Sequence, residues 1–300
     1  MKLLAALPIV LVLSGCAAFT DDSVGLDNGV QVATAFYPLQ YVADRVAGER
    51  LDHGVTVENL TAPGGEPHDL EPTVRETAEV AQADLVVYER GFQPAVDDTV
   101  DENAAGAVLD VADVVHLVPF RDHGVDSSED DPHFWQDPLL LAKVGDAVAD
   151  QLSDVDPDHA DEYAANAADL RSDLEQLDQA YATGLAHCQR NTVVVSHDAF
   201  GYLERYGIDM ETILGLSPDS EPTPADLARL QDLIRTDGIT TVFGESLVSP
   251  TVANALAQDT GVQSKILDPI EGLSDETADE DYLSLMRSNL QELREANGCE

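Results

Sequence analysis

Three histidines of the chain stand where a metal ion could be held. His68 lies just beyond the end of an expected strand, and His197 directly follows the apolar strand TVVV. His133 lies in the stretch DDPHFWQDP, where a proline near each end fixes the backbone and blocks a helix. In open α/β sheets the carboxyl ends of the strands form the ligand crevice. We therefore expect these three imidazoles to serve one common site.

A carboxylate is expected to complete this site. Asp268 lies at another strand end and is fixed by the proline that follows it, while Glu245 holds the same kind of place one unit earlier and stays open as the alternative. Three imidazoles and one carboxylate make a closed, roughly tetrahedral site suited to zinc. Because no coordination position then remains for a catalytic water, and the sequence has no HExxH motif, we predict metal binding and no enzymatic activity.

Other residues near these candidates are assigned plainer roles. His116 and His123 lie in the polar segment 115–131, which could collect metal weakly or be ordinary surface. Phe134 and Trp135 follow His133, and their rings are expected to pack behind it and keep water away from its inner side.

Strand and helix patterns alternate along the chain, which indicates parallel βαβ units. In the first half the predicted strands are 30–35, 55–60 and 84–88, and the predicted helices are 37–47 and 73–82. In the second half the predicted strands are 192–195, 211–214, 240–243 and 264–267, and the predicted helices are 199–206, 224–235, 250–259 and 278–296. The predicted fold class is α/β, with two similar parallel-sheet lobes.

A single long helix is expected to join the lobes. Asp156 suits the N-cap and Pro157 the first helical position, and neither glycine nor proline follows until Gly184. The apolar residues fall mostly three or four apart: Tyr163, Leu170, Leu174, Leu177, Tyr181 and Leu185. The predicted domains are a first lobe at 29–155, a connecting helix at 156–187 and a second lobe at 188–300.

The N-terminus indicates export. Lys2 precedes an apolar run that is too short to span a bilayer and suits a signal peptide at 1–15. The next residues, LSGC, resemble the lipobox of bacterial lipoproteins, in which the cysteine is lipidated. We expect lipidation at Cys16 and a small, polar and acidic tether at 16–28, which would anchor the protein to the outer face of the cell membrane.

Export leaves the two other cysteines in an oxidising compartment. Cys188 and Cys299 are expected to form a disulfide, because two free thiols are uncommon outside the cytoplasm. Such a bridge closes a long loop and would stabilise the fold by roughly 4 to 5 kcal/mol in the chain-entropy model.

The chain is strongly acidic. It has 15 Lys and Arg against 58 Asp and Glu, a formal net charge of −43 at pH 7. A field of this sign repels polyanions, so nucleic acid and anionic membrane surfaces are poor partners. The acids are spread along the whole chain, which favours a solvated acidic surface suited to high external salt.

Four motifs, PHDLEPT, DPHFWQDP, SHDAFGYLERYGI and LDPIEG, occur in this order around the predicted long helix. Together they resemble the metal-binding lipoproteins of bacterial ABC importers, in particular the zinc-uptake branch, over essentially the whole mature chain. The resemblance implies a metal site in the cleft between the lobes, with His68 and His133 as ligands from the first lobe and His197 and Asp268 from the second.

The resemblance also implies a function and its alternatives. The expected protein is a monomer that captures zinc outside the membrane and hands it to an ABC permease. Manganese-binding relatives tend to have glutamate at the third ligand position, so His197 favours zinc over manganese or iron. The short segment 115–131 departs from the long histidine-rich loop of many zinc relatives, and Pro67 stands where some of them have a glutamate. A metal-binding surface adhesin stays open as an alternative.

Overall fold

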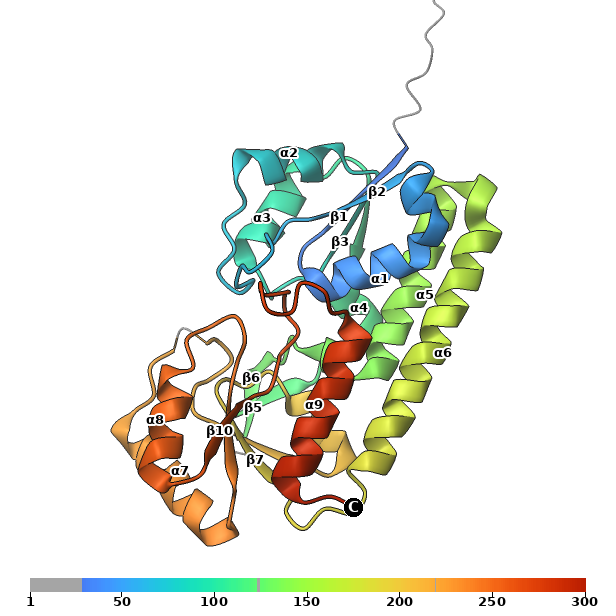
Figure 1. The fold of residues 1–300 in the computed structure, drawn as a ribbon. Coiled ribbons are helices and arrows are strands. Elements are labelled where there is room, and N and C mark those ends of the chain that lie inside the picture. Colours follow the sequence, from blue (N-terminus) through green and yellow to red (C-terminus); the bar gives the residue numbers. More distant parts are fainter. Residues whose placement is uncertain (1–28, 123–124, 219) are drawn as a thin grey trace, which may run out of the picture.

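The computed structural model describes residues 29–122, 125–218 and 220–300 and places them in two α/β lobes joined by one long helix (Figure 1). The first lobe is built on a parallel sheet with the strand order β2–β1–β3–β4. Its strands are β1 (Val30–Thr34), β2 (Val55–Asn59), β3 (Leu85–Tyr88) and β4 (Ala107–Asp110). All of its carboxyl ends therefore lie at one edge.

Helices cover both faces of this sheet. They are α1 (Tyr37–Ala47), α2 (Val74–Gln82), α3 (Pro94–Asn103) and the short α4 (Val111–Val115). The helices α2 and α3 lie on one side of the sheet. Helix α1 lies on the other side, together with the two long helices described below (Figure 1). A capping box between Thr73 and Glu76 begins α2 directly after the loop that carries His68.

The second lobe repeats the plan with the parallel strand order β10–β9–β7–β8. Its strands are β7 (Thr192–Val195), β8 (Asp209–Thr212), β9 (Thr241–Gly244) and β10 (Gln263–Ile266). Its helices are α7 (Pro224–Asp237), α8 (Thr251–Thr260) and α9 (Tyr282–Asn297). The predicted class, α/β with two parallel-sheet lobes, is confirmed.

Two long helices, α5 (Pro138–Val155) and α6 (Ala160–Gly184), run side by side along the first lobe, and α6 continues to α9 of the second lobe (Figure 1). The predicted apolar stripe of α6 is buried against α5, α1 and α9. Gly145 of α5 lets the helices approach closely, because a Cβ there would lie 3.1 Å from Cδ2 of Leu170. The main contacts of α5 are with α6 and with elements of the first lobe, so α6 is the helix that joins the lobes, as predicted.

The predicted elements differ from the structure mainly in four places. Residues Pro157–His159, expected as the start of the connecting helix, form a 3-10 helix, and α6 begins at Ala160. The segment 115–131, expected as a loop, contains the antiparallel hairpin of β5 (Pro119–Asp122) and β6 (Val125–Asp130). The predicted helix 199–206 is a 3-10 helix, Gly201–Tyr206. The predictions also omitted α3, α4, α5 and β4, whose burial depends on neighbours that are distant in sequence.

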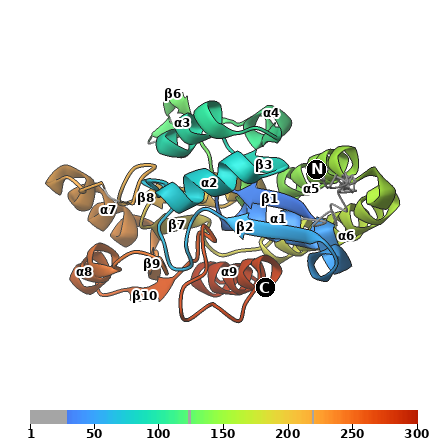
Figure 2. The same cartoon turned by 90° about the horizontal axis from the view of Figure 1, so that it is seen from above.

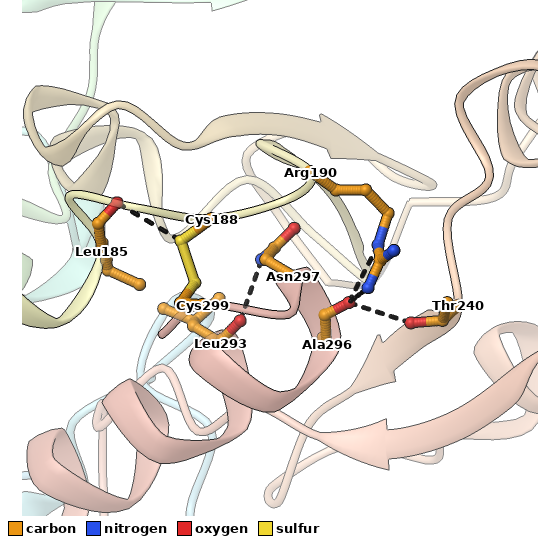
Figure 3. Close-up of a disulfide and its surroundings, with 8 residues drawn as sticks. All are labelled: Leu185, Cys188, Arg190, Thr240, Leu293, Ala296, Asn297 and Cys299. Atoms are coloured by element: carbon orange, nitrogen blue, oxygen red, sulfur yellow. Dashed lines mark hydrogen bonds between the residues drawn. A yellow bond between two sulfur atoms is a disulfide. The ribbon is translucent and has the colours of Figure 1, made fainter.

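The end of the chain is fastened to the end of α6 by the disulfide Cys188–Cys299, as predicted (Figure 3). Backbone hydrogen bonds reinforce it, since the amides of Gln189 and Arg190 donate to the carbonyl oxygen of Asn297 at 3.0 and 3.1 Å. The expected signal peptide, Cys16 and tether lie outside the described residues. Within the described part of the chain, every helix is too short or too polar to cross a bilayer.

Candidate metal centre

Four side chains from both lobes converge on one point. His68 follows β2 and His133 follows β6, whereas His197 follows β7 and Glu271 follows β10. One potential ligand atom of each lies within 4.8 Å of those of the other three. His133, His197 and Glu271 are fully buried, and the side chain of His68 is 10 % exposed. The structure thus brings together the three histidines that the sequence singled out.

The carboxylate of Glu271 lies at the centre of this cluster. Its Oε1 is 3.2 Å from Nε2 of His197 and 3.4 Å from Nε2 of His133, and its Oε2 is 3.9 Å from Nδ1 of His68. The buried Nε2 of His68 has no hydrogen-bond partner among the described residues. Three imidazoles and a carboxylate at this spacing fit a single zinc ion, since zinc is commonly held by four nitrogen, sulfur or oxygen ligands.

Each histidine has a further carboxylate on its Nδ1 side. Glu66 contacts Nδ1 of His68, Oδ1 of Asp131 lies 2.8 Å from Nδ1 of His133, and Oε1 of Glu245 lies 2.7 Å from Nδ1 of His197. The same three carboxylates accept hydrogen bonds from the backbone amides of the histidines that they contact. A carboxylate in this position holds the proton on Nδ1, orients the ring and leaves the Nε2 lone pair for a metal.

The fourth position of the cluster is occupied by Glu271, and not by Asp268 or Glu245. Oδ1 of Asp268 accepts a hydrogen bond of 2.8 Å from the amide of Ile270, which closes the turn that carries Glu271 inward. Ile270 is buried and has a φ of 60°, an unusual value for a β-branched residue. Sequence reasoning chose Asp268 for its place at the strand end. The motif LDPIEG contains Glu271, but the turn decides which acid faces the histidines.

The loops that carry His133 and Glu271 are joined across the lobes. Nε1 of Trp135 and Nε2 of Gln136 both donate to the carbonyl oxygen of Pro269, at 2.8 and 2.6 Å. The hydroxyl of Tyr282 donates to the carbonyl oxygen of Trp135 at 2.5 Å. The buried Trp135 ring also packs 5.2 Å from the His133 ring. These bonds hold the site in place before any ligand arrives.

Of the two histidines in the segment 115–131, His116 stands apart from this cluster. His116 is exposed and ends α4 with a φ of 56°. His123 lies outside the described residues.

Neighbouring charges change the proton affinity of the site. Burial disfavours an imidazolium, but the hydrogen bond and charge of Asp131, with Glu271, outweigh burial and raise the pKa of His133. The pKa of His197 lies well above its ordinary value, because the charges of Glu245 and Glu271 outweigh burial there. Burial alone would raise the pKa of Glu271, yet the surrounding imidazoles, His197 above all, hold it far below the usual range. Without a metal the site therefore retains protons, which a cation must displace.

The fold and the buried cluster define a two-lobed α/β protein with a candidate metal site to which each lobe contributes two side chains. Residues 32–296 match the family described as "Zinc-uptake complex component A periplasmic", so the chain belongs to this family of extracytoplasmic solute-binding proteins, which are not enzymes. The family resemblance of the four sequence motifs is thereby confirmed.

Curated relatives agree with this assignment. The chain is 33 % identical to the zinc-binding lipoprotein AdcA of Streptococcus pneumoniae over 97 % of its own length and spans 61 % of that longer protein. It is 30 % identical to the high-affinity zinc uptake system protein ZnuA of Bacillus subtilis, over 92 % of this chain and 89 % of the relative.

Solved structures show the same fold. The Zn(II)-bound ZnuA-like domain of S. pneumoniae AdcA has a TM-score of 0.76 and 32 % identity, covering 90 % of this chain and 99 % of that domain. The laminin-binding protein Lmb of Streptococcus agalactiae, described as having adhesin and metal-transporting activity, has a TM-score of 0.80 and 30 % identity, over 89 % of this chain and 99 % of that one.

Proposed function

We propose that this protein captures zinc outside the cytoplasm and delivers it to an ABC permease for import. The observation that carries the proposal is the buried group of His68, His133, His197 and Glu271, whose ligand atoms lie within 4.8 Å of one another. These four residues are the proposed zinc ligands, and Asp268 and Glu245 are assigned supporting roles in place of ligation. Zinc is the cargo of this site.

The choice of zinc follows from the donor atoms. Imidazole suits zinc, whereas manganese prefers sites rich in carboxylate, carbonyl and water oxygens. The carboxylates that contact the outer nitrogens of the three histidines favour neutral rings whose Nε2 atoms can bind the metal. Import of manganese or iron is therefore the less favoured alternative.

Four protein ligands leave no open coordination position, which supports storage and transfer in place of hydrolysis. Release to a permease then requires at least one of the four side chains to leave the metal. The loops around His68 and Glu271 meet through a hydrogen bond of 2.8 Å from the amide of Gly64 to the carbonyl oxygen of Leu273, and a movement that separates these loops would break it.

Membrane attachment through a lipid on Cys16, with residues 16–28 as a tether, is part of the same proposal. The lipobox-like sequence LSGC supports it, as does the lipoprotein name of the S. pneumoniae relative. A tethered monomer would stay close to its permease partner while its metal site remains free to load.

Metal analysis tests the core of the proposal. Purified protein is expected to hold about one tightly bound zinc per chain, and the triple variant His68→Ala, His133→Ala, His197→Ala is expected to hold none. Competitive loading with zinc and manganese identifies the preferred cargo. Undiminished zinc in the triple variant, or a preference for manganese, would contradict the assignment.

A surface adhesin is the second candidate, favoured by the similarity to Lmb, whose structure superposes with a TM-score of 0.80. Deletion of the gene separates the two functions. Transport predicts a growth defect under zinc limitation that added zinc corrects. Adhesion predicts normal growth with reduced attachment to laminin.

A further inference from the structure

A cavity lies beside the proposed zinc site, and His68 forms part of its wall. It has a volume of about 420 Å³, and its wall includes His68, Phe92, Glu89, Arg90, Glu129 and Asp130. Three of these residues are acids that the zinc site does not use. The cavity therefore places carboxylate oxygens next to a proposed zinc ligand.

Glu89 is the unusual member of this wall. It follows β3, so it lies at the same edge of the first sheet as the end of β2, which leads to the loop of His68. The residue is 2 % exposed, and neither of its carboxylate oxygens has a hydrogen-bond partner among the described residues. A buried carboxyl group without a partner costs free energy that a bound cation would recover.

The surroundings of Glu89 are acidic as well. Burial raises its pKa well above the ordinary value, and the charges of Asp131, Asp110 and Asp97 raise it further. Arg90 at the wall does not neutralise Glu89, because its guanidinium donates to both oxygens of Asp101 at 2.7 and 3.2 Å. Without a cation Glu89 therefore favours its protonated, uncharged form, and a cation that binds in the cavity has to displace this proton.

We propose that this cavity binds a hydrated divalent cation, with Glu89 as its inner ligand and Glu129 and Asp130 at its rim. An all-oxygen site of this kind suits cations that keep part of their water shell, in contrast to the imidazole-rich zinc site. Six waters occupy roughly 180 Å³ at about 30 Å³ each, so a cation with its first shell fits the cavity. The proposal builds on the proposed zinc function by placing a second cation beside the first.

The test uses protein whose zinc site is already filled, so that added manganese can report on the cavity alone. Mn²⁺ is titrated at about 1 M KCl, where the Debye length is only about 3 Å and surface acids attract it weakly. Electron paramagnetic resonance counts the free Mn²⁺. Fluorescence of Trp135, the chain's single tryptophan, reports on the cavity, because its ring packs 5.7 Å from that of Phe92 in the cavity wall.

One saturable Mn²⁺ per chain with quenching of Trp135 is expected in the wild type. Glu89→Gln is expected to weaken this binding at least tenfold, and Glu129→Gln with Asp130→Asn to weaken it less. Glu79→Gln is the matched control, because Glu79 also has a buried oxygen without a partner among the described residues but lines a different cavity.

Zinc content and the melting temperature of each variant are measured in parallel. Retention of one zinc in Glu89→Gln shows that the fold and the first site are intact. Saturable Mn²⁺ binding that survives Glu89→Gln, or its absence from the wild type, overturns the second site while leaving the zinc function standing. Wild-type protein that cannot be loaded with zinc contradicts the proposed function instead.

Discussion

The two lobes share one sheet plan but bury it differently. One continuous apolar core contains the first sheet, the helices α5, α6 and α9, and one face of the second sheet. The outer part of the second lobe, built by α7, α8 and the other face of that sheet, has a separate small core. Figure 2 shows α7 and α8 at the opposite end of the molecule from α5 and α6.

The second sheet is the boundary between these cores. Val193 and Val195 of β7 belong to the large core and Val194 to the small one, because successive side chains of a strand point to opposite faces. Ligands from both lobes are thus supported by the same continuous core. The difference predicts that the metal site depends on the shared core and stays in place when the outer layer loosens.

The largest expected effect comes from removing one ligand from each lobe in turn. His133→Ala and His197→Ala are each expected to weaken zinc binding at least about 1,000-fold, roughly 4 kcal/mol, if both lobes contribute equally to the site. Chelator competition measures the affinity, and His116→Ala is the control because His116 is exposed and outside the cluster. If either variant kept near-normal zinc affinity, the two lobes would not contribute equally to zinc binding.

A matched pair of core variants tests whether the two cores are independent. Leu170 in the large core and Leu230 in the small core are both 0 % exposed. Leu170→Ala is expected to lower the global free energy of unfolding by about 2–5 kcal/mol. Leu230→Ala is expected to speed hydrogen exchange mainly in α7 and α8. Equally fast exchange in α6 would show that the two cores unfold as one.

Zinc binding should weaken on acidification. The raised pKa values of His133 and His197 mean that protons compete with zinc already near neutral pH, and the competition grows as pH falls below those values. With one or two protons displaced, the affinity is expected to drop about 10- to 100-fold from pH 7 to pH 6. A titration of zinc affinity against pH measures this slope. A flat profile across this range would contradict neutral imidazole ligation.

The carboxylates of the second lobe can be ranked by substitution. Glu245→Gln is expected to weaken zinc binding about 10- to 100-fold, because Glu245 orients His197. Asp268→Asn is expected to change it about threefold or less, since an amide oxygen can still accept the hydrogen bond from Ile270. A larger loss in Asp268→Asn than in Glu271→Gln would restore Asp268 as the ligand.

The smallest effect is expected on overall shape. The connecting helix α6 and the continuous core limit the movement of the lobes, so small-angle scattering should show no resolvable change when zinc is added. Loop ordering near Glu271 would remain visible by hydrogen exchange. A clear decrease in the radius of gyration would mean that the lobes hinge despite their shared core.

Local patterns in the sequence were sufficient for much of the fold. The alternation of strands and helices and the apolar stripe of α6 can be read from the spacing of neighbouring residues. The disulfide follows from the presence of two cysteines that can pair with each other. The helix α5 was missed although Asp137 and Pro138 repeat the start signal that predicted the connecting helix, and although its buried residues between Leu141 and Leu152 recur three or four apart. The hairpin β5–β6 was missed because its polar residues show little of the apolar alternation typical of a buried strand.

The sequence by itself determined the α/β class, the pairing of the two cysteines and the choice of three histidines for one common site. Residue types, their spacing and their places at the ends of strands can all be read along the chain. Only the tertiary structure decided which carboxylate joins them. Asp268 and Glu271 lie three residues apart in one motif, and the turn through Pro269 and Ile270 directs Glu271 to the histidines. That turn is held by Trp135 and Gln136 from the other lobe. A contact across more than a hundred residues of chain leaves no trace in the local sequence pattern.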